Sequence, residues 1–198
     1  MKGVKERIMD AAVELFYKKG FAATGVREIA KKAGVSTSMI NYHFGSKMGI
    51  LKEIMEVLFE KLIEEFKVTN LDGKPLEERI RIAIKALVKS IKNNEKMFRI
   101  MLMQIPDEES DLIEYRASKV REIIYSVFKN HFEGFGDEKH FEILGPALSG
   151  MIFSHFILKD IIPQVSGIEY PEDFYDTYAD YIADLYLHGA LSIINKNK

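Results

Sequence analysis

The spacing of apolar residues predicts helices along almost the whole chain. From residue 4 to 19, apolar side chains recur every three or four positions and form one helical face: Val4, Ile8, Ala11, Ala12, Leu15 and Phe16. Similar patterns predict helices over about 46–66, 76–92, 97–105 and 111–131, another after residue 138, and a last one opening at Pro171. We therefore predict an all-α protein.

Two short helical patterns separated by a turn occupy residues 24–47. In the first, Thr24 is placed to cap a helix whose apolar residues are Val26, Ile29, Ala30 and Ala33. Gly34 then supplies a residue without a Cβ, as a tight turn between helices requires. Ser36 is placed to cap the second helix, which ends near Phe44.

The second short helix has one apolar and one polar face. On a helical wheel Ile40 and Phe44 point inward, while Ser38, Asn41 and Tyr42 point broadly outward and Thr37 is free near the start. Hydroxyls, an amide and a phenol without an acidic residue form a surface that can hydrogen-bond base edges beside phosphates. This pattern favours a helix-turn-helix, whose second helix enters the major groove. The alternative is a polar surface turn in an ordinary helical protein.

The distribution of charge supports the nucleic-acid interpretation. The 198 residues have a net charge of −2, but residues 1–50 hold 9 Lys and Arg against 4 Asp and Glu, a balance of +5. The rest of the chain has a balance of −7. A basic N-terminal head on an acidic body suggests that the head meets a polyanion.

Composition excludes several other classes. The chain has no cysteine, which excludes a disulfide framework and a thiolate zinc site. We find no apolar run of the roughly 20 residues that span a bilayer and no signal-peptide pattern, so we expect a cytoplasmic protein.

Enzyme motifs are also missing from the sequence. It contains no HExxH, P-loop, GxGxxG or GxSxG, and Asp137 and His140 form a lone carboxylate-x-x-His pattern where a di-iron bundle needs two. We expect no catalytic site, no metal and no cofactor.

The N-terminal motifs resemble those of the TetR family of transcriptional regulators. The matching features are the ELF…GF ending of the first helix, T-x-V-R-x-I-A-x-x-A-G-V-S, and the Y-H-F-x-S-K block, which together cover about the first 50 residues. The resemblance implies a helix-turn-helix DNA-binding domain over residues 1–48 and a helical ligand-binding and dimerisation domain over 49–198. It also implies a homodimeric, ligand-responsive repressor that binds a palindromic operator in double-stranded DNA and is released by a small molecule.

The same resemblance assigns DNA-binding residues. Thr37, Ser38, Asn41, Tyr42 and His43 would lie on or beside the recognition helix, Arg27 would reach the DNA, and Lys47 with Thr24 would contact phosphates. Many family members have an aromatic residue where this chain has Asn41, which leaves its role open. His43 lies between the two faces of the wheel, so packing and DNA contact are both compatible with it.

In the body, two groups of residues are candidates for further sites. The ligand pocket would lie among the middle helices, lined by Phe98, Met101, Met103, Tyr115, Tyr125, Phe128, Phe153 and His155. If it is apolar, the effector is a hydrophobic or amphipathic molecule. The resemblance places the dimer interface on the last two long helices, with Met151, Phe156, Phe174, Tyr178, Tyr181, Ile182 and Leu185 as candidates. Both groups are also compatible with an ordinary core.

A second functional hypothesis remains open from the sequence. The protein would sense a small molecule and act through protein partners, with the head as a docking module. The basic head argues against it, and a steep loss of DNA affinity with rising salt would distinguish the two hypotheses.

Overall fold

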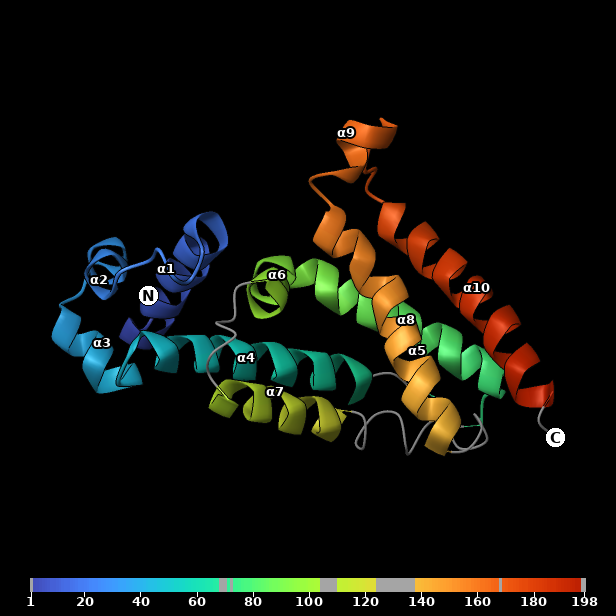
Figure 1. The fold of residues 1–198 in the computed structure, drawn as a ribbon. Helices are drawn as coiled ribbons and strands as arrows, with labels where there is room; N and C mark the ends of the chain where they lie inside the picture. Colours follow the sequence, from blue (N-terminus) through green and yellow to red (C-terminus); the bar gives the residue numbers. More distant parts are fainter. Residues whose placement is uncertain are drawn as a thin grey trace. The chain divides into compact units, whose positions relative to one another are not determined.

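The computed structural model describes residues 2–67, 71, 73–103, 110–123, 138–167 and 169–196, and these contain helices and no strand. The helices are shown in Figure 1 and are bounded as follows: α1 Val4–Lys19, α2 Val26–Ala33, α3 Thr37–Phe44, α4 Lys47–Lys67, α5 Leu76–Asn93, α6 Glu95–Met103, α7 Ser110–Ile123, α8 Glu138–Leu158, α9 Ile162–Ser166 and α10 Phe174–Lys196. The predicted all-α fold is confirmed.

The chain divides into two compact units. One contains residues 1–61 and 94–120, and the other contains residues 62–93 and 121–198. Helix α4 therefore begins in the first unit and ends in the second, and α6 belongs to the first. The boundary predicted at residue 48 separates the DNA-binding domain from the ligand-binding and dimerisation domain. It concerns function and not compactness, and it stays a prediction.

The first unit includes the three-helix head. Its core forms where the apolar faces of α1, α2 and α3 meet, and Ile8, Phe16, Ile29 and Ile40 are each fully buried there. Gly34 ends α2 in a left-handed conformation with φ of 64°, and the next residue donates its N–H to the Ala30 carbonyl. This is the helix ending that the sequence predicts, because glycine adopts positive φ without a steric cost.

The same unit contains α6 and most of α7. Helix α6 packs against α1 and buries Phe98, Ile100 and Met101. Helix α7 is bound to α4 through Glu56, whose carboxylate accepts hydrogen bonds from the Tyr115 hydroxyl and from Lys119 Nζ, the latter at 2.6 Å. These two donors, Lys119 first, hold the pKa of Glu56 below its ordinary value.

The second unit is built around α5, α8 and α10. Helix α10 packs along α5 and α8. The Tyr178 hydroxyl donates to the Met151 carbonyl at 2.6 Å, and the Tyr186 hydroxyl donates to the Leu144 carbonyl at 3.1 Å. Burial raises the pKa of both phenols, so both remain protonated donors at neutral pH. The Arg81 guanidinium of α5 lies 2.5 Å from the Asp184 carboxylate of α10, and this partly exposed ion pair also joins the two helices.

Local details differ from the sequence-based expectations. The N-cap of α2 is Gly25 rather than Thr24, and α10 begins at Phe174, whose N–H bonds to the Pro171 carbonyl, rather than at Pro171 itself. The pattern did not reveal the five-residue helix α9. Pro146 lies inside a continuous α8 and does not divide it. None of the described helices is long and apolar enough to cross a membrane.

Candidate nucleic-acid interface

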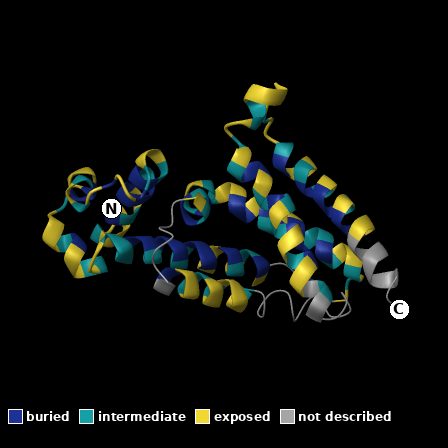
Figure 2. Ribbon diagram, viewed as in Figure 1, coloured by how far each residue is buried: buried dark blue, intermediate teal, exposed yellow. Residues whose placement is uncertain are grey.

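Helix α3 presents the polar face that the sequence predicts. Ser36 is its N-cap residue with extended backbone angles, and its side-chain oxygen lies 2.7 Å from that of Ser38 instead of capping the helix. Ile40 is fully buried and fixes the rotation of the helix about its axis. The opposite face is therefore held toward solvent, as Figure 2 shows.

Tyr42 is the most prominent side chain of that face. It is 83% exposed, the largest exposed fraction among the large apolar and aromatic side chains of the described residues. Thr37, Ser38 and Asn41 are exposed on the same short helix. The arrangement gathers three hydrogen-bonding side chains and one aromatic ring on one turn and a half of helix.

His43 lies between the faces, as its position on the wheel implies. Its ring is half-buried and meets Tyr42 edge-on, with ring centroids 5.1 Å apart, and Phe44 at 6.2 Å. The geometry is compatible with His43 orienting the Tyr42 ring, and its direct contact with DNA stays a prediction.

Thr24 and Lys47 are engaged within the head. Thr24 is only 1% exposed, and its hydroxyl donates to the Gly20 carbonyl at 2.8 Å. Lys47 Nζ donates to the carbonyls of Phe21 at 2.8 Å and Thr24 at 3.0 Å, and lies 4.3 Å from the Phe21 ring centroid. In this conformation both side chains hold the loop between α1 and α2, so phosphate contacts by them stay predictions that require rearrangement.

The charges of the head favour an anionic partner. Each of its four acidic residues lies within 4 Å of a lysine ammonium group: Glu6 and Asp10 near Lys2, Glu14 near Lys32, and Glu28 near Lys19. Arg27 and Lys31 on α2 are exposed. Lysine side chains offset the four carboxylates of the head. The remaining lysine and arginine side chains give the head a net positive charge, which favours a polyanionic partner.

The predicted ligand residues fall in both compact units. Phe98 and Met101 are buried in α6, Met103 is exposed, and Tyr115 is bound to Glu56. In the second unit His155 is buried and Phe153 is half-buried. The remaining two candidates, Tyr125 and Phe128, lie outside the described residues. Their common pocket stays a prediction.

The predicted dimer residues divide into inward and outward groups. Phe156 and Ile182 are buried, and Phe174 and Tyr178 pack on the His155 ring at centroid distances of 4.7 and 4.9 Å. Tyr181 and Leu185, four residues apart on α10, are 67% and 66% exposed. Met151 is half-buried, and its carbonyl accepts the Tyr178 hydroxyl.

Comparison with known proteins identifies the helix-turn-helix. The family model described as "Bacterial regulatory proteins, tetR family" matches residues 8–54, which run from α1 into α4. The head of this chain therefore matches the DNA-binding domain of the TetR family. The HTH-type transcriptional regulator YerO of Bacillus subtilis is 28% identical over 160 residues, covering 78% of this chain and 55% of YerO. The alignments span about half the length of the first curated relatives.

Solved TetR-family structures share the fold. PfmR of Thermus thermophilus superposes with a TM-score of 0.67 at 24% identity, covering 94% of this chain and 97% of PfmR. FadR of Bacillus halodurans superposes with a TM-score of 0.74 at 16% identity, covering 96% of this chain and 97% of FadR. At these identities the likeness concerns the fold, and it extends well beyond the head.

Proposed function

We propose that this protein is a ligand-responsive DNA-binding regulator that occupies a palindromic operator as a homodimer. The observation that carries the proposal is the outward face of α3, where Tyr42 stands 83% exposed beside Thr37, Ser38 and Asn41. Ile40 is fully buried in the head core and fixes the rotation of α3, so these side chains face solvent before DNA binds. Little rearrangement of the α3 backbone is then needed on binding.

Each group on this face suits a distinct contact with a duplex. Thr37 and Ser38 lie at the N-terminal end of α3, the part of a recognition helix that reaches base edges. Asn41 carries an amide able to pair bidentately with adenine, and Tyr42 combines a hydroxyl with a ring that packs on sugar. Arg27 on α2 supplies a cation for the backbone.

A second copy of the chain would supply the other half of the operator. We propose that the interface includes the outward face of α10, where Tyr181 and Leu185 are exposed, and the exposed residues Ile143, Ala147 and Gly150 of α8. Small residues let a partner helix approach closely. Two half-sites about 34 Å apart would then be engaged together.

The effector would act on the body. The lining of the proposed pocket is rich in aromatic and methionine side chains, which suits a hydrophobic or amphipathic effector. Binding of this effector would release the protein from its operator, so the protein would act as a repressor in the absence of the effector. These finer features rest on the resemblance to the family and on the character of the candidate residues.

Selection of duplexes from a random DNA pool tests the proposal. A two-fold-symmetric consensus sequence is the expected result, and binding to it should weaken steeply as salt rises. Failure of the folded protein to enrich any sequence at low salt would overturn direct operator binding and favour the protein-docking hypothesis. The selected duplex also provides the probe for screening apolar compounds that release it.

A further inference from the structure

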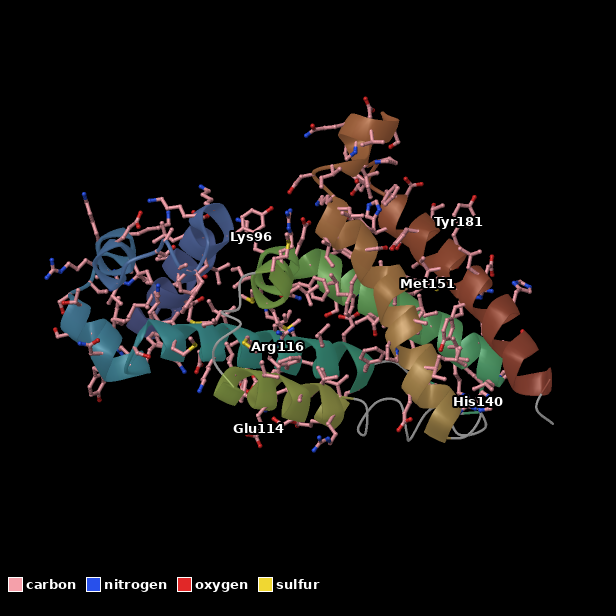
Figure 3. All side chains as sticks on the ribbon, in the orientation of Figure 1. Lys96, Glu114, Arg116, His140, Met151 and Tyr181 are labelled. Carbon is pink, nitrogen blue, oxygen red and sulfur yellow. The ribbon has the colours of Figure 1, made fainter. Side chains whose placement is uncertain are left out.

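The chain passes from α3 to α4 through a very tight turn. Helix α3 ends at Phe44 and α4 begins at Lys47, so Gly45 and Ser46 alone make the connection, and the ribbon in Figure 3 turns sharply there. Gly45 has φ of 72° and ψ of −45°, and the Ser46 N–H donates to the Phe44 carbonyl at 2.8 Å. A hydrogen bond between residues i and i+2 around such angles is a γ-turn with positive φ, the rarer and more strained of the two γ-turn forms.

This γ-turn brings the Phe44 carbonyl against the first turn of α4. A Cβ at residue 49 would overlap the Phe44 carbonyl oxygen and lie 3.0 Å from its carbon. The obstacle is backbone and not the end of a flexible side chain, so it cannot rotate away. The Gly49 N–H also donates to the Ser46 hydroxyl at 3.0 Å, which satisfies a free donor of the first turn. Only glycine at residue 49 therefore lets α3 and α4 approach this closely.

The two helices are not held equally firmly at this junction. Beside Gly49, Ile50 and Leu51 are fully buried, as is Ile54 one turn later. The eight residues of α3 include one buried side chain, that of Ile40. A helix held by one buried side chain yields before a helix held by three. Crowding at residue 49 would therefore be relieved mainly by a tilt of α3.

A lysine of α1 joins the end of α3 to α4. Lys5 Nζ lies 2.5 Å from the Glu53 carboxylate of α4 and 5.9 Å from the centroid of the Phe44 ring. With its C-terminal end held by this contact and by the γ-turn, α3 would move most at its N-terminal end. Thr37 and Ser38 lie at that end, and Thr37 is about 10 Å from Phe44 at a rise of about 1.5 Å per residue. A tilt would therefore displace the residues placed to reach base edges.

We propose that Gly49 is a positioning residue for operator recognition, because its lack of a side chain sets the angle at which the exposed face of α3 meets DNA. The inference rests on the proposed function and adds a residue that acts through the pose of α3. Hydrogen bonds to base edges weaken steeply when their distance or angle departs from the ideal. The attraction of lysine and arginine to phosphates is less directional and supplies binding to any sequence. Gly49 therefore controls the preference for the operator and not the affinity for DNA in general.

Gly49→Ala is the test, because it adds only the Cβ that the Phe44 carbonyl excludes. Fluorescence anisotropy measures the affinity of the full-length variant for the selected operator duplex and for a scrambled duplex of the same length. We expect about ten-fold weaker binding to the operator, comparable to the loss of one base contact, and a change of less than about two-fold with the scrambled duplex. The salt slope with the scrambled duplex should stay the same, since the phosphate contacts are retained.

Two further variants complete the experiment. Gly3→Ala is the matched control, since Gly3 precedes α1 with an extended backbone and has open space where a Cβ would lie. It should bind both duplexes as the wild-type protein does. If circular dichroism shows that Gly49→Ala does not fold, Gly45→Ala takes its place. That change meets no neighbouring atom but disfavours the positive φ of the γ-turn, so it should reduce the preference for the operator in the same way.

The possible outcomes are distinguishable. Failure of the wild-type protein to prefer any duplex would refute the proposed function. If the wild-type protein prefers the operator, undiminished preference in a folded Gly49→Ala protein would overturn the positioning role alone. Equal losses with both duplexes would also overturn it, because they would indicate fewer folded molecules or fewer phosphate contacts and not a changed pose of α3. When Gly45→Ala is the variant measured, the same two results lead to the same conclusions.

Discussion

At the scale of single residues, Tyr42 provides the most direct test of the recognition face. Its ring makes little contribution to the core at 83% exposure, so Tyr42→Ala should leave folding and dimerisation intact. We expect operator binding to weaken by about 1–3 kcal/mol, measured by fluorescence anisotropy with the selected duplex. Tyr42→Phe separates the roles of the ring and the hydroxyl. Wild-type affinity in the alanine variant would show that the recognition face lies elsewhere.

Lys47 distinguishes a structural role from a DNA contact. Its ammonium group satisfies the carbonyls of Phe21 and Thr24, which Lys47→Met would leave without this donor. We expect the free energy of unfolding to fall by about 1–3 kcal/mol in urea titration. The exposed Lys31→Met is the control and should change stability little. If Lys47 instead contacts a phosphate, stability will hold and the salt slope of DNA binding will fall by about 0.9.

At the scale of helices, the carboxylate of Glu56 connects α4 to α7 in a pH-dependent way. Lys119 and Tyr115 lower its pKa from the ordinary value of 4.5. The stabilisation is therefore present in full above that value and is lost as pH falls through the lower folded-state pKa. We expect Glu56→Gln to reduce the melting temperature at neutral pH, with the difference from wild type shrinking on acidification. A difference independent of pH would contradict an ionic role.

The helices also show what the sequence can and cannot reveal. Local periodicity was sufficient to predict α1 and the outward face of α3, because the burial of residues such as Ile40 follows from spacing along one helix. The role of Lys47 depends on loop carbonyls reached through tertiary folding, over 23 residues for the Lys47–Thr24 bond, whereas the Thr24 hydroxyl bonds the Gly20 carbonyl only four residues away. The pairing of Arg99 with Tyr17 spans 82 residues, and periodicity carries no signal for it.

At the scale of the whole molecule, the exposed apolar residues of α10 form part of the proposed dimer interface. Tyr181 and Leu185 lie on an outward face, while Ile182 and Tyr186 beside them are buried within the unit. Introducing a charge at Leu185 should therefore spare the core and disrupt only contacts with a second copy. We predict that wild-type protein sediments at twice the chain mass of 22.8 kDa and that Leu185→Arg shifts it toward one chain mass.

The control for this assembly is an equally radical change on another exposed apolar residue. Ile113 on α7 is 54% exposed, and Ile113→Arg should leave the mass unchanged. Loss of the dimer should also weaken operator binding, because one head engages one half-site while two joined heads gain from their high effective concentration. A Leu185→Arg protein that remains dimeric would place the interface elsewhere. A monomeric variant with undiminished affinity would show that the two heads do not act together on DNA.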